Sequence, residues 1–168
     1  RTTLNGEGVQ HQDGHSHVLA SVVPNLMTYD PAFSYELAII VREGIRRMYE
    51  EQENIFYYLT VYNENYTHPK IPDHCEEGIL KGMYLFKTAS EELQKNYKGE
   101  PIHLLGSGSI MQQVLEAQEK LESQGIPVTI WSVTSYNLLH KDFLESKKSK
   151  EKSYLENILQ NQTGHFIA

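Results

Sequence analysis

The chain has 168 residues, enough for one ordinary domain or two small ones and too few for a complete large multidomain enzyme. Its 22 acidic and 15 basic side chains give a formal net charge of -7, so the average surface would repel a phosphate backbone and we expect no nucleic-acid partner. No apolar run approaches the roughly 20 residues that span a bilayer, so we also expect no membrane-spanning segment.

Two features of the sequence bear on the cellular compartment and on the extent of the polypeptide. Cys75 is the only cysteine and cannot form an internal disulfide, which favours a reducing compartment and predicts a cytoplasmic protein. The chain opens at Arg1 without Met or a signal peptide, and it closes in an apolar run at 166–168, where a strand would begin. We therefore expect it to be an internal piece of a longer polypeptide.

The first half predicts a strand, a helix and a second strand. A short helical turn precedes a buried strand at 26–28, and a helix then starts at Asp30-Pro31, with Asp30 as its cap and Pro31 in its first position. The run 55–62 is apolar almost throughout, which is typical of a strand covered on both faces of a parallel sheet. The apolar face expected of the helix comprises Phe33, Leu37, Ile40, Val41, Ile45 and Met48.

The second half predicts a further strand–helix–strand unit. The segment 63–77 is polar and rich in proline, so it should link two lobes near a domain boundary. Strands are expected at 83–87, 102–105 and 128–133. The helix between the last two should follow the turn Gly106-Ser107-Gly108-Ser109, with Ile110, Val114, Ala117 and Leu121 on one face and Gly125 at its end. This order predicts an α/β fold with parallel sheets and a right-handed crossover, followed by a solvated lysine-rich segment at 141–152.

The most distinctive local pattern lies near the start of the chain. His11, Asp13, His15 and His17 alternate at a spacing of two, so in an extended segment all four would project to one side. Such a cluster could shuttle protons or hold a substrate carboxylate. It could also bind zinc or iron, or be an exposed polar loop without a chemical role. The pattern leaves these three readings open.

Other candidate residues give weaker signals. The glycine turn at 106–109 resembles a phosphate-binding loop, but Gln112 stands where a dinucleotide fingerprint needs its third glycine, and no acidic residue ends the next strand. Tight turning is the favoured explanation, and we expect no dinucleotide. Glu64 follows a predicted strand and could act as an acid or base, although a loop anchor is favoured. Cys75 has no evident activating base and is interpreted as incidental.

Several motifs together resemble one family. The chain is similar, over roughly residues 1 to 140, to the decarboxylating first component of the pyruvate dehydrogenase complex in its homodimeric bacterial form. The resemblance thins from 141 to about 160. The motifs that carry it are Arg1-Thr2-Thr3-Leu4-Asn5-Gly6-Glu7-Gly8, the segment His11 to His17, Tyr29-Asp30-Pro31, Asn63-Glu64-Asn65-Tyr66, Glu76-Glu77-Gly78-Ile79 and Leu104-Leu105-Gly106-Ser107-Gly108-Ser109.

The resemblance implies a transketolase-like enzyme that depends on thiamin diphosphate and magnesium. It makes residues 1–70 the back part of the middle, pyrimidine-binding domain, 71–100 a linker and the start of the next domain, and 101–168 the first part of the C-terminal domain. The main cofactor-binding motifs, including the magnesium-diphosphate motif and the activating glutamate, would lie upstream of Arg1, so no residue here is assigned to a metal. The site would lie between two copies of the subunit.

The resemblance also implies roles for the histidine loop, which would face the reactive thiazolium. His11 matches an active-site histidine of the family, Asp13 and His17 match the Asp and His of the related transketolase loop, and His15 replaces a proline there. The implied reaction decarboxylates pyruvate and acetylates the lipoyl group of the dihydrolipoyl acetyltransferase component. An imidazole suits proton donation in that step, so His11 is the expected donor and Asp13 is expected to orient an imidazole.

Two alternatives come from other classes of protein. One is a metal-dependent enzyme domain built on His11, Asp13, His15 and His17. The other is a non-catalytic module that uses the second lobe for subunit assembly.

Overall fold

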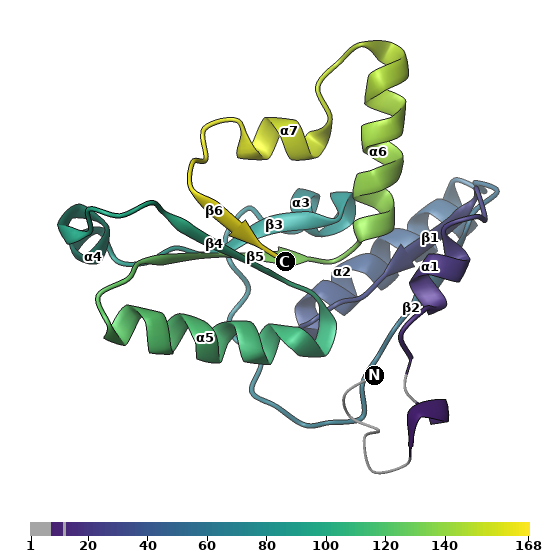
Figure 1. Ribbon diagram of the computed structural model, residues 1–168. Coiled ribbons are helices and arrows are strands. Elements are labelled where there is room, and N and C mark those ends of the chain that lie inside the picture. The colour runs from purple at the N-terminus through teal and green to yellow at the C-terminus, as the bar shows by residue number, and fades with distance from the viewer. Residues whose placement is uncertain (1–7, 12) are drawn as a thin grey trace.

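The computed structural model of the chain describes residues 8–11 and 13–168 (Figure 1). In chain order the elements are the 3-10 turn Val9–His11, α1 (Ser16–Ala20), β1 (Leu26–Tyr29), α2 (Ser34–Ile45), the π-helical turn Arg46–Glu50, β2 (Phe56–Leu59), α3 (Glu76–Lys81), β3 (Met83–Lys87), α4 (Glu91–Asn96), β4 (Ile102–Gly106), the 3-10 turn Gly108–Ile110, α5 (Met111–Ser123), β5 (Val128–Val133), α6 (Tyr136–Ser149), α7 (Tyr154–Leu159) and β6 (His165–Ile167). Within the described residues, every helix is too short or too polar to cross a bilayer.

The strands form two sheets. β1 and β2 pair in parallel, with Leu26 opposite Phe56, and with α1 and α2 they make what we call the first lobe. The second lobe contains α3 to α7 and a sheet of order β3-β5-β4-β6, in which β4 is parallel to both β5 and β6. The α/β prediction and the parallel strand–helix–strand unit at 102–133 are confirmed. β3 runs antiparallel to β5, so the second sheet is mixed.

Helices cover both faces of the second sheet. α5 lies on one face and α3, α6 and α7 lie on the other (Figure 1). Alternate residues of β5 point to opposite faces: Val128 and Ile130 pack with Met111 of α5, whereas Trp131 and Val133 pack toward α6 and α7. β5 is therefore buried along almost its whole length, including the polar Ser132, because helices cover both of its faces.

The first helix starts later than its sequence predicts. α2 begins at Ser34, and Asp30 is not its cap, because the backbone of Asp30 is bonded to the second lobe. Glu36 instead reaches back and accepts hydrogen bonds from the N–H groups of Ala32 and Phe33. The predicted apolar face is wrong at two positions, since Val41 and Ile45 are 41% and 51% exposed.

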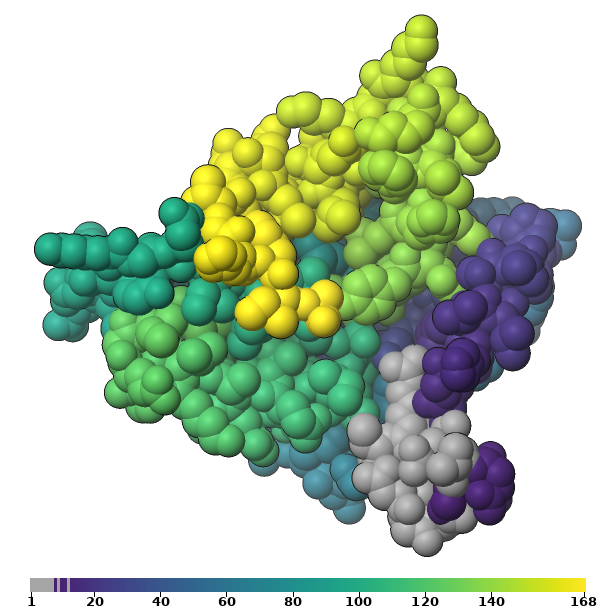
Figure 2. Space-filling model, viewed as in Figure 1, coloured from purple at the N-terminus to yellow at the C-terminus, as the bar shows by residue number. Residues whose placement is uncertain are grey.

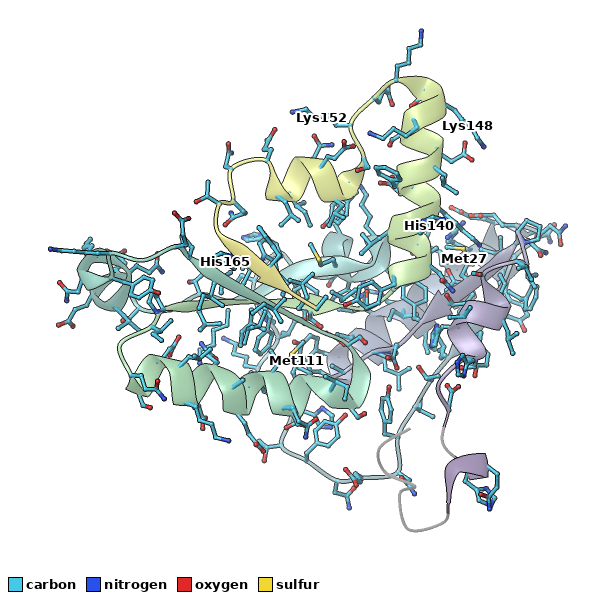
Figure 3. The ribbon with its side chains drawn as sticks, viewed as in Figure 1. Met27, Met111, His140, Lys148, Lys152 and His165 are labelled. Carbon is cyan, nitrogen blue, oxygen red and sulfur yellow. The ribbon has the colours of Figure 1, made fainter. Side chains whose placement is uncertain are left out.

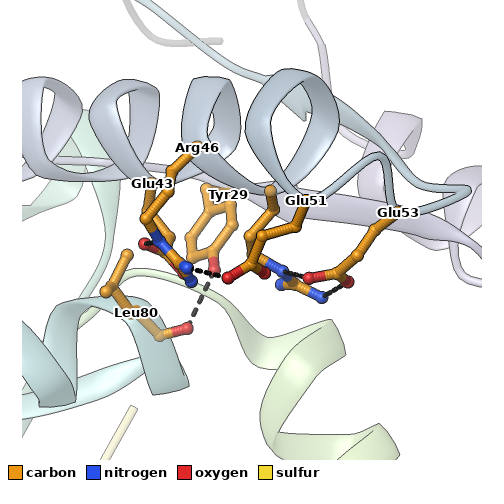
Figure 4. A network of polar contacts seen from close by, with 7 residues as sticks. Tyr29, Glu43, Arg46, Glu51, Glu53 and Leu80 are labelled. Carbon is orange, nitrogen blue, oxygen red and sulfur yellow. Dashed lines mark hydrogen bonds and ion pairs between the residues drawn. The ribbon is translucent and has the colours of Figure 1, made fainter.

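A π-helical turn ends this helix. Arg46 pairs with Glu43 and Glu51, and Arg47 pairs with Glu53 at 2.5 Å (Figure 4). The wider turn changes the angular spacing of side chains, so the 3.6-residue periodicity does not continue into 46–50.

The second strand is less buried than its composition predicts. β2 covers only Phe56–Leu59, and Phe56 and Tyr58 are 47% and 37% exposed. The prediction that both faces are covered is therefore wrong for the described residues: Tyr57 and Leu59 pack against the core, and the alternate side chains face outward.

α6 joins the two lobes. Its Lys141 ammonium donates to the carbonyl oxygens of Pro24 and Leu26, at 3.2 and 2.9 Å, so α6 lies against the first lobe, as the touching purple and yellow-green atoms in Figure 2 show. Partial burial lowers the pKa of Lys141. The prediction of a solvated segment at 141–152 is wrong for this residue, but Lys148 and Lys152 extend into solvent (Figure 3).

A buried histidine fixes the last strand. His103 of β4 accepts a hydrogen bond from Trp131 Nε1 at 3.1 Å, so its other nitrogen, Nε2, donates to the Thr163 carbonyl at 2.9 Å. Its ring stacks on Phe166 with centroids 4.3 Å apart. β4, β5 and β6 are therefore connected by side chains as well as by their backbone ladder.

Candidate functional site at the carboxyl ends of the strands

The carboxyl ends of strands from both lobes meet at one place. The Asp30 N–H, directly after β1, donates to the Thr134 carbonyl at 2.8 Å, and the Gly108 N–H donates to the Asp30 carbonyl at 3.0 Å. Thr134 and Gly108 follow β5 and β4 respectively. Open α/β sheets bind ligands outside the carboxyl ends of their strands, so this junction is the candidate site.

Gly108 is required by the close approach of the two lobes. It has a φ of +50°, and a Cβ built on it would lie 2.6 and 2.7 Å from the two carboxylate oxygens of Asp30. Any side chain there would displace the carboxylate. The positive φ of Gly108 agrees with the tight turn expected from the sequence, and the contact with Asp30 adds a steric reason that the sequence did not predict.

Asp30 is a buried carboxylate with two hydroxyl donors. Its side chain is 6% exposed, and the hydroxyls of Thr60 and Tyr62 both donate to Oδ1. A carboxylate so far from water requires such donors. Thr60 and Tyr62 follow β2, so the carboxyl ends of β1, β2, β4 and β5 all contribute to the junction.

His17 lies directly beside this carboxylate system. Its Nε2 is 3.0 Å from Thr60 Oγ1, and its backbone carbonyl accepts a hydrogen bond of 2.8 Å from Asn137 Nδ2 of α6. The same Asn137 amide donates to Thr28 Oγ1 at 2.8 Å. A cavity of about 60 Å³ opens here, lined by His17, Asp30, Ser107, Val133, Thr134, Ser135, Tyr136 and Asn137.

The remaining members of the histidine cluster lie elsewhere. His11 belongs to the turn Val9–His11 and is exposed, and His15 is exposed at the N-terminal boundary of α1. Asp13 Oδ1 accepts from the Ser16 N–H at 3.0 Å, and its other oxygen accepts from the Ser16 hydroxyl. The expectation that an extended segment projects all four to one side is wrong, because a 3-10 turn and a helix interrupt it.

Metal binding finds no support in the part of the chain that the structure describes. Across residues 8–11 and 13–168, no three His, Cys, Asp or Glu side chains gather so that they could hold a metal ion. The donors around the 60 Å³ cavity are one imidazole, one carboxylate, hydroxyls and an amide, which suit hydrogen bonding to an organic molecule.

A second cavity, of about 200 Å³, lies beside the first turn of α2. Glu64 lines it and is exposed. Tyr66 donates to the Ala32 carbonyl at 3.0 Å, and His68 Nδ1 accepts from the Ser34 N–H at 3.1 Å. Those contacts tie the long connection after β2 to the start of the helix.

Sequence reasoning missed a buried acid, Glu36, which is 0% exposed. Its Oε1 accepts from the hydroxyls of Tyr84 and Ser132, at 2.7 and 2.6 Å, and its Oε2 accepts from two backbone N–H groups. Burial raises the pKa of Glu36, while these donors act in the opposite direction. Its position beside the predicted core residues Phe33, Leu37 and Ile40 was the available signal.

Cys75 is buried against the first lobe. Its sulfur lies 3.1 Å from the Pro72 carbonyl oxygen, and burial raises the pKa of its thiol. A thiol that resists ionisation is a poor nucleophile, which agrees with its interpretation as incidental.

Two family models match the chain. The model described as the pyruvate dehydrogenase E1 component middle domain matches residues 1–69, and that described as the transketolase-like C-terminal domain matches residues 82–168, more than half of the chain. Segments 1–7 and 12, which carry part of the sequence resemblance, lie outside the described residues.

Curated relatives and solved structures agree with these matches. The pyruvate dehydrogenase E1 component of Pseudomonas aeruginosa is 49% identical over 177 residues, covering 100% of this chain and 20% of the relative. That of Escherichia coli strain K12 is 49% identical over 144 residues, covering 84% and 16%. A Pichia stipitis transketolase structure superposes with a TM-score of 0.58 at 23% identity, covering 85% of this chain and 19% of that one, and supports the fold.

The chain spans about a fifth of the length of the first curated relatives that it matches. Its two halves match the middle and the C-terminal domain models in the order in which they follow each other here. The chain therefore belongs to the transketolase-like family that includes the pyruvate dehydrogenase E1 components.

Proposed function

We propose that the chain is part of a pyruvate dehydrogenase E1 subunit, which decarboxylates pyruvate and acetylates the lipoyl group of a dihydrolipoyl acetyltransferase component. The observation that best supports this is the junction at the strand ends, where His17, in the segment that matches the middle domain, lies beside Asp30 and faces the first turn of α6, in the segment that matches the C-terminal domain. The curated relatives are named pyruvate dehydrogenase E1 components, which supports the same proposal.

The cofactor would be thiamin diphosphate with magnesium. When bound, it supplies a carbon nucleophile for the keto carbon of pyruvate and an electron sink for the loss of carbon dioxide. The donors at the strand ends fit its organic part better than a metal ion, so we assign no residue of this chain to magnesium or to the diphosphate. Those groups are proposed to bind to residues outside this chain.

The histidine loop would serve proton transfer and substrate binding. In reductive acetylation the electron pair left at the acetyl carbon by the loss of carbon dioxide would form a bond to one lipoyl sulfur, the S–S bond would break, and the other sulfur would take up a proton. Release of the acetyl group would then break its bond to the cofactor. His11, exposed in its turn, is the proposed donor of that proton. Asp13 is proposed to orient an imidazole in addition to its contact with Ser16, and His17 would form a polar wall of the site. His15 stays a candidate without an assigned step.

The proposed partners are those of such a complex. A second copy of the subunit would complete the active site, pyruvate would be the small substrate, and the lipoyl domain of the acetyltransferase would enter to be acetylated. We propose that the protein works in the cytoplasm, where a single unpaired cysteine is stable.

The function is tested in the full-length subunit that carries this sequence. We expect thiamin-dependent release of carbon dioxide from pyruvate with an artificial electron acceptor, and acetylation of an added lipoyl domain. Absence of both activities in the folded, cofactor-supplied protein would refute the proposal.

The variant His11→Ala tests the proton donor. Lipoyl acetylation should fall by about 100- to 10,000-fold, the usual contribution of a general acid, whereas decarboxylation with the artificial acceptor should fall much less. The free energy of unfolding should change by less than about 0.5 kcal/mol, because His11 is exposed.

His140→Ala, at another exposed histidine, serves as the control and should leave both rates unchanged. Equal losses of both activities in His11→Ala would instead place His11 in substrate or cofactor binding.

A further inference from the structure

We propose that Asp30 is a positioning residue for His17, which it holds through the Thr60 hydroxyl in the form that carries a hydrogen on Nε2. The inference deepens the proposed function and rests on it for the claim that His17 serves the reaction. The tautomer itself follows from hydrogen-bond geometry that is independent of any activity.

The direction of the hydrogen bonds fixes the tautomer. Thr60 has one hydroxyl hydrogen, and it lies within reach of the Asp30 carboxylate and, at 3.4 Å, of the Tyr29 carbonyl. Both of these groups are acceptors only, so the hydrogen is committed to one of them. Thr60 Oγ1 must then accept the bond that joins it to His17 Nε2 at 3.0 Å. Nε2 is therefore the donor in this bond, and Nδ1 is the nitrogen without a hydrogen in the neutral ring.

The carboxylate end of this relay is immobilised by both lobes. The backbone of Asp30 is bonded to Thr134 and Gly108, and Gly108 leaves just enough room for the carboxylate. Tyr62 donates to the same oxygen as Thr60. The Asp30 carboxylate is thus held at a fixed place, which a more exposed, flexible side chain would not be.

His17, at the other end of the relay, is also held in place by its neighbours. The His17 carbonyl accepts from Asn137, and the edge of its ring meets Tyr58 with centroids 5.5 Å apart. When Nδ1 takes up a proton, the positive charge lies two hydrogen bonds away from Asp30. The arrangement would therefore both orient the ring and stabilise its charged form, as carboxylates that act through a hydrogen bond do in other enzymes.

The test uses the full-length subunit with its cofactor. Thr60→Val keeps the shape of the side chain and removes the hydroxyl, whereas Thr60→Ser keeps the hydroxyl. We expect Thr60→Val to lower kcat for decarboxylation by about 10- to 100-fold, because the imidazole of His17 loses the partner that orients it. We also expect the pH profile of kcat to shift. Thr60→Ser should restore both. A loss in Thr60→Val that comes with an unchanged pH profile would overturn the proposal.

A double-mutant cycle tests Asp30 itself. If Asp30 acts on His17 through Thr60, then Asp30→Asn combined with Thr60→Val should lose little more activity than the stronger single variant. Independent, multiplying losses would contradict a relay. Tyr62→Phe removes the other hydroxyl from the same Asp30 oxygen without touching His17, so it should leave the His17 tautomer unchanged.

The tautomer is measured directly from the nitrogen chemical shifts of histidine-labelled protein, with His17→Gln identifying the resonance. Wild type should show Nε2–H and a non-protonated Nδ1 at high pH, and Thr60→Val should lose this preference. An Nδ1–H form in wild type would refute the relay even in an active enzyme. Conversely, Nε2–H in a protein without decarboxylase activity would leave the relay standing and refute the proposed function.

Discussion

At the scale of single residues, Glu36 connects more elements by hydrogen bonds than its position in the sequence predicts. It connects α2 of the first lobe to Tyr84 of β3 and Ser132 of β5 in the second, and it also accepts from the N–H groups that precede its own helix. Tyr35 extends the network through its hydroxyl, 2.7 Å from that of Tyr84. One buried carboxylate therefore sets both the start of a helix and the alignment of the lobes.

We expect Glu36→Ala and Glu36→Gln to differ strongly. Alanine leaves two hydroxyls and two backbone N–H groups without an acceptor, so it should lower the free energy of unfolding by about 3 to 5 kcal/mol. Glutamine can keep its oxygen toward the backbone N–H groups, and the hydroxyls of Tyr84 and Ser132 can rotate to accept from its amide, so its cost should be about 1 kcal/mol. Urea unfolding of the chain measures both, and equal losses would contradict this account.

The difference in stability between wild type and Glu36→Gln should change with pH in a definite direction. Because burial raises the pKa of Glu36 above its ordinary value of 4.5, the folded state holds this proton more tightly than the unfolded state. The stabilisation is complete below 4.5 and is lost as pH rises through the folded-state pKa, by up to about 1.4 kcal/mol per pH unit. The stability of Glu36→Gln should therefore gain on wild type as pH rises between about pH 4 and 8. If wild type instead gained stability over Glu36→Gln as pH rises, the four hydrogen-bond donors would outweigh burial in setting the pKa of Glu36.

Residue identities alone predicted only part of the site. The sequence singled out His17 and placed Asp30 at the end of a strand, but it interpreted Asp30 as a helix cap. The partners that decide otherwise are Thr60, Gly108 and Thr134, and they are remote in sequence. Local propensity cannot anticipate a residue whose carboxylate takes its donors from the end of β2 and whose backbone is bonded to the ends of β4 and β5.

At the scale of elements, agreement is best for short apolar runs with clear polar boundaries. The strands at 83–87 and 128–133 have the predicted bounds because their apolar runs are short and bounded by polar residues and turns. β2 was expected to be covered on both faces because apolar and aromatic residues fill the whole run, yet one face is exposed. The helices α3, α4 and α7 were missed, since each is only six residues long and too short to show a helical apolar repeat.

The attachment of β6 depends on His103. His103→Leu keeps the bulk of the side chain but leaves the buried Trp131 N–H without its acceptor and the Thr163 carbonyl without its donor, and it removes the stack on Phe166. We expect the free energy of unfolding to fall by about 2 to 3 kcal/mol. His140→Leu, at an exposed position of α6, is the control and should change it by less than about 0.5 kcal/mol. Fluorescence of Trp131 during urea unfolding reports both, and equal effects would refute a special role for His103.

At the scale of the whole molecule, the two lobes share one interior. Tyr29, Ile39 and Ile40 of the first lobe pack in a single cluster with Ile79 and Tyr84 of the second. The polar junction at the strand ends lies at the border of the same contact. The lobes therefore support each other, and the geometry of the site depends on their contact as much as on either sheet.

The 168-residue chain by itself should lack part of the active site. On the proposed function, the groups that bind magnesium and the diphosphate belong to the remaining four fifths of a subunit like its relatives. We therefore expect no thiamin-dependent release of carbon dioxide from pyruvate by the 168-residue chain by itself. Circular dichroism on the same sample checks that the chain is folded, so that inactivity is not mistaken for unfolding, and the full-length subunit assayed in parallel is the positive control. Activity of the isolated chain would mean that the residues at its strand ends bind the cofactor without the rest of the subunit. The reaction would then take place at the junction of His17, Asp30 and Gly108.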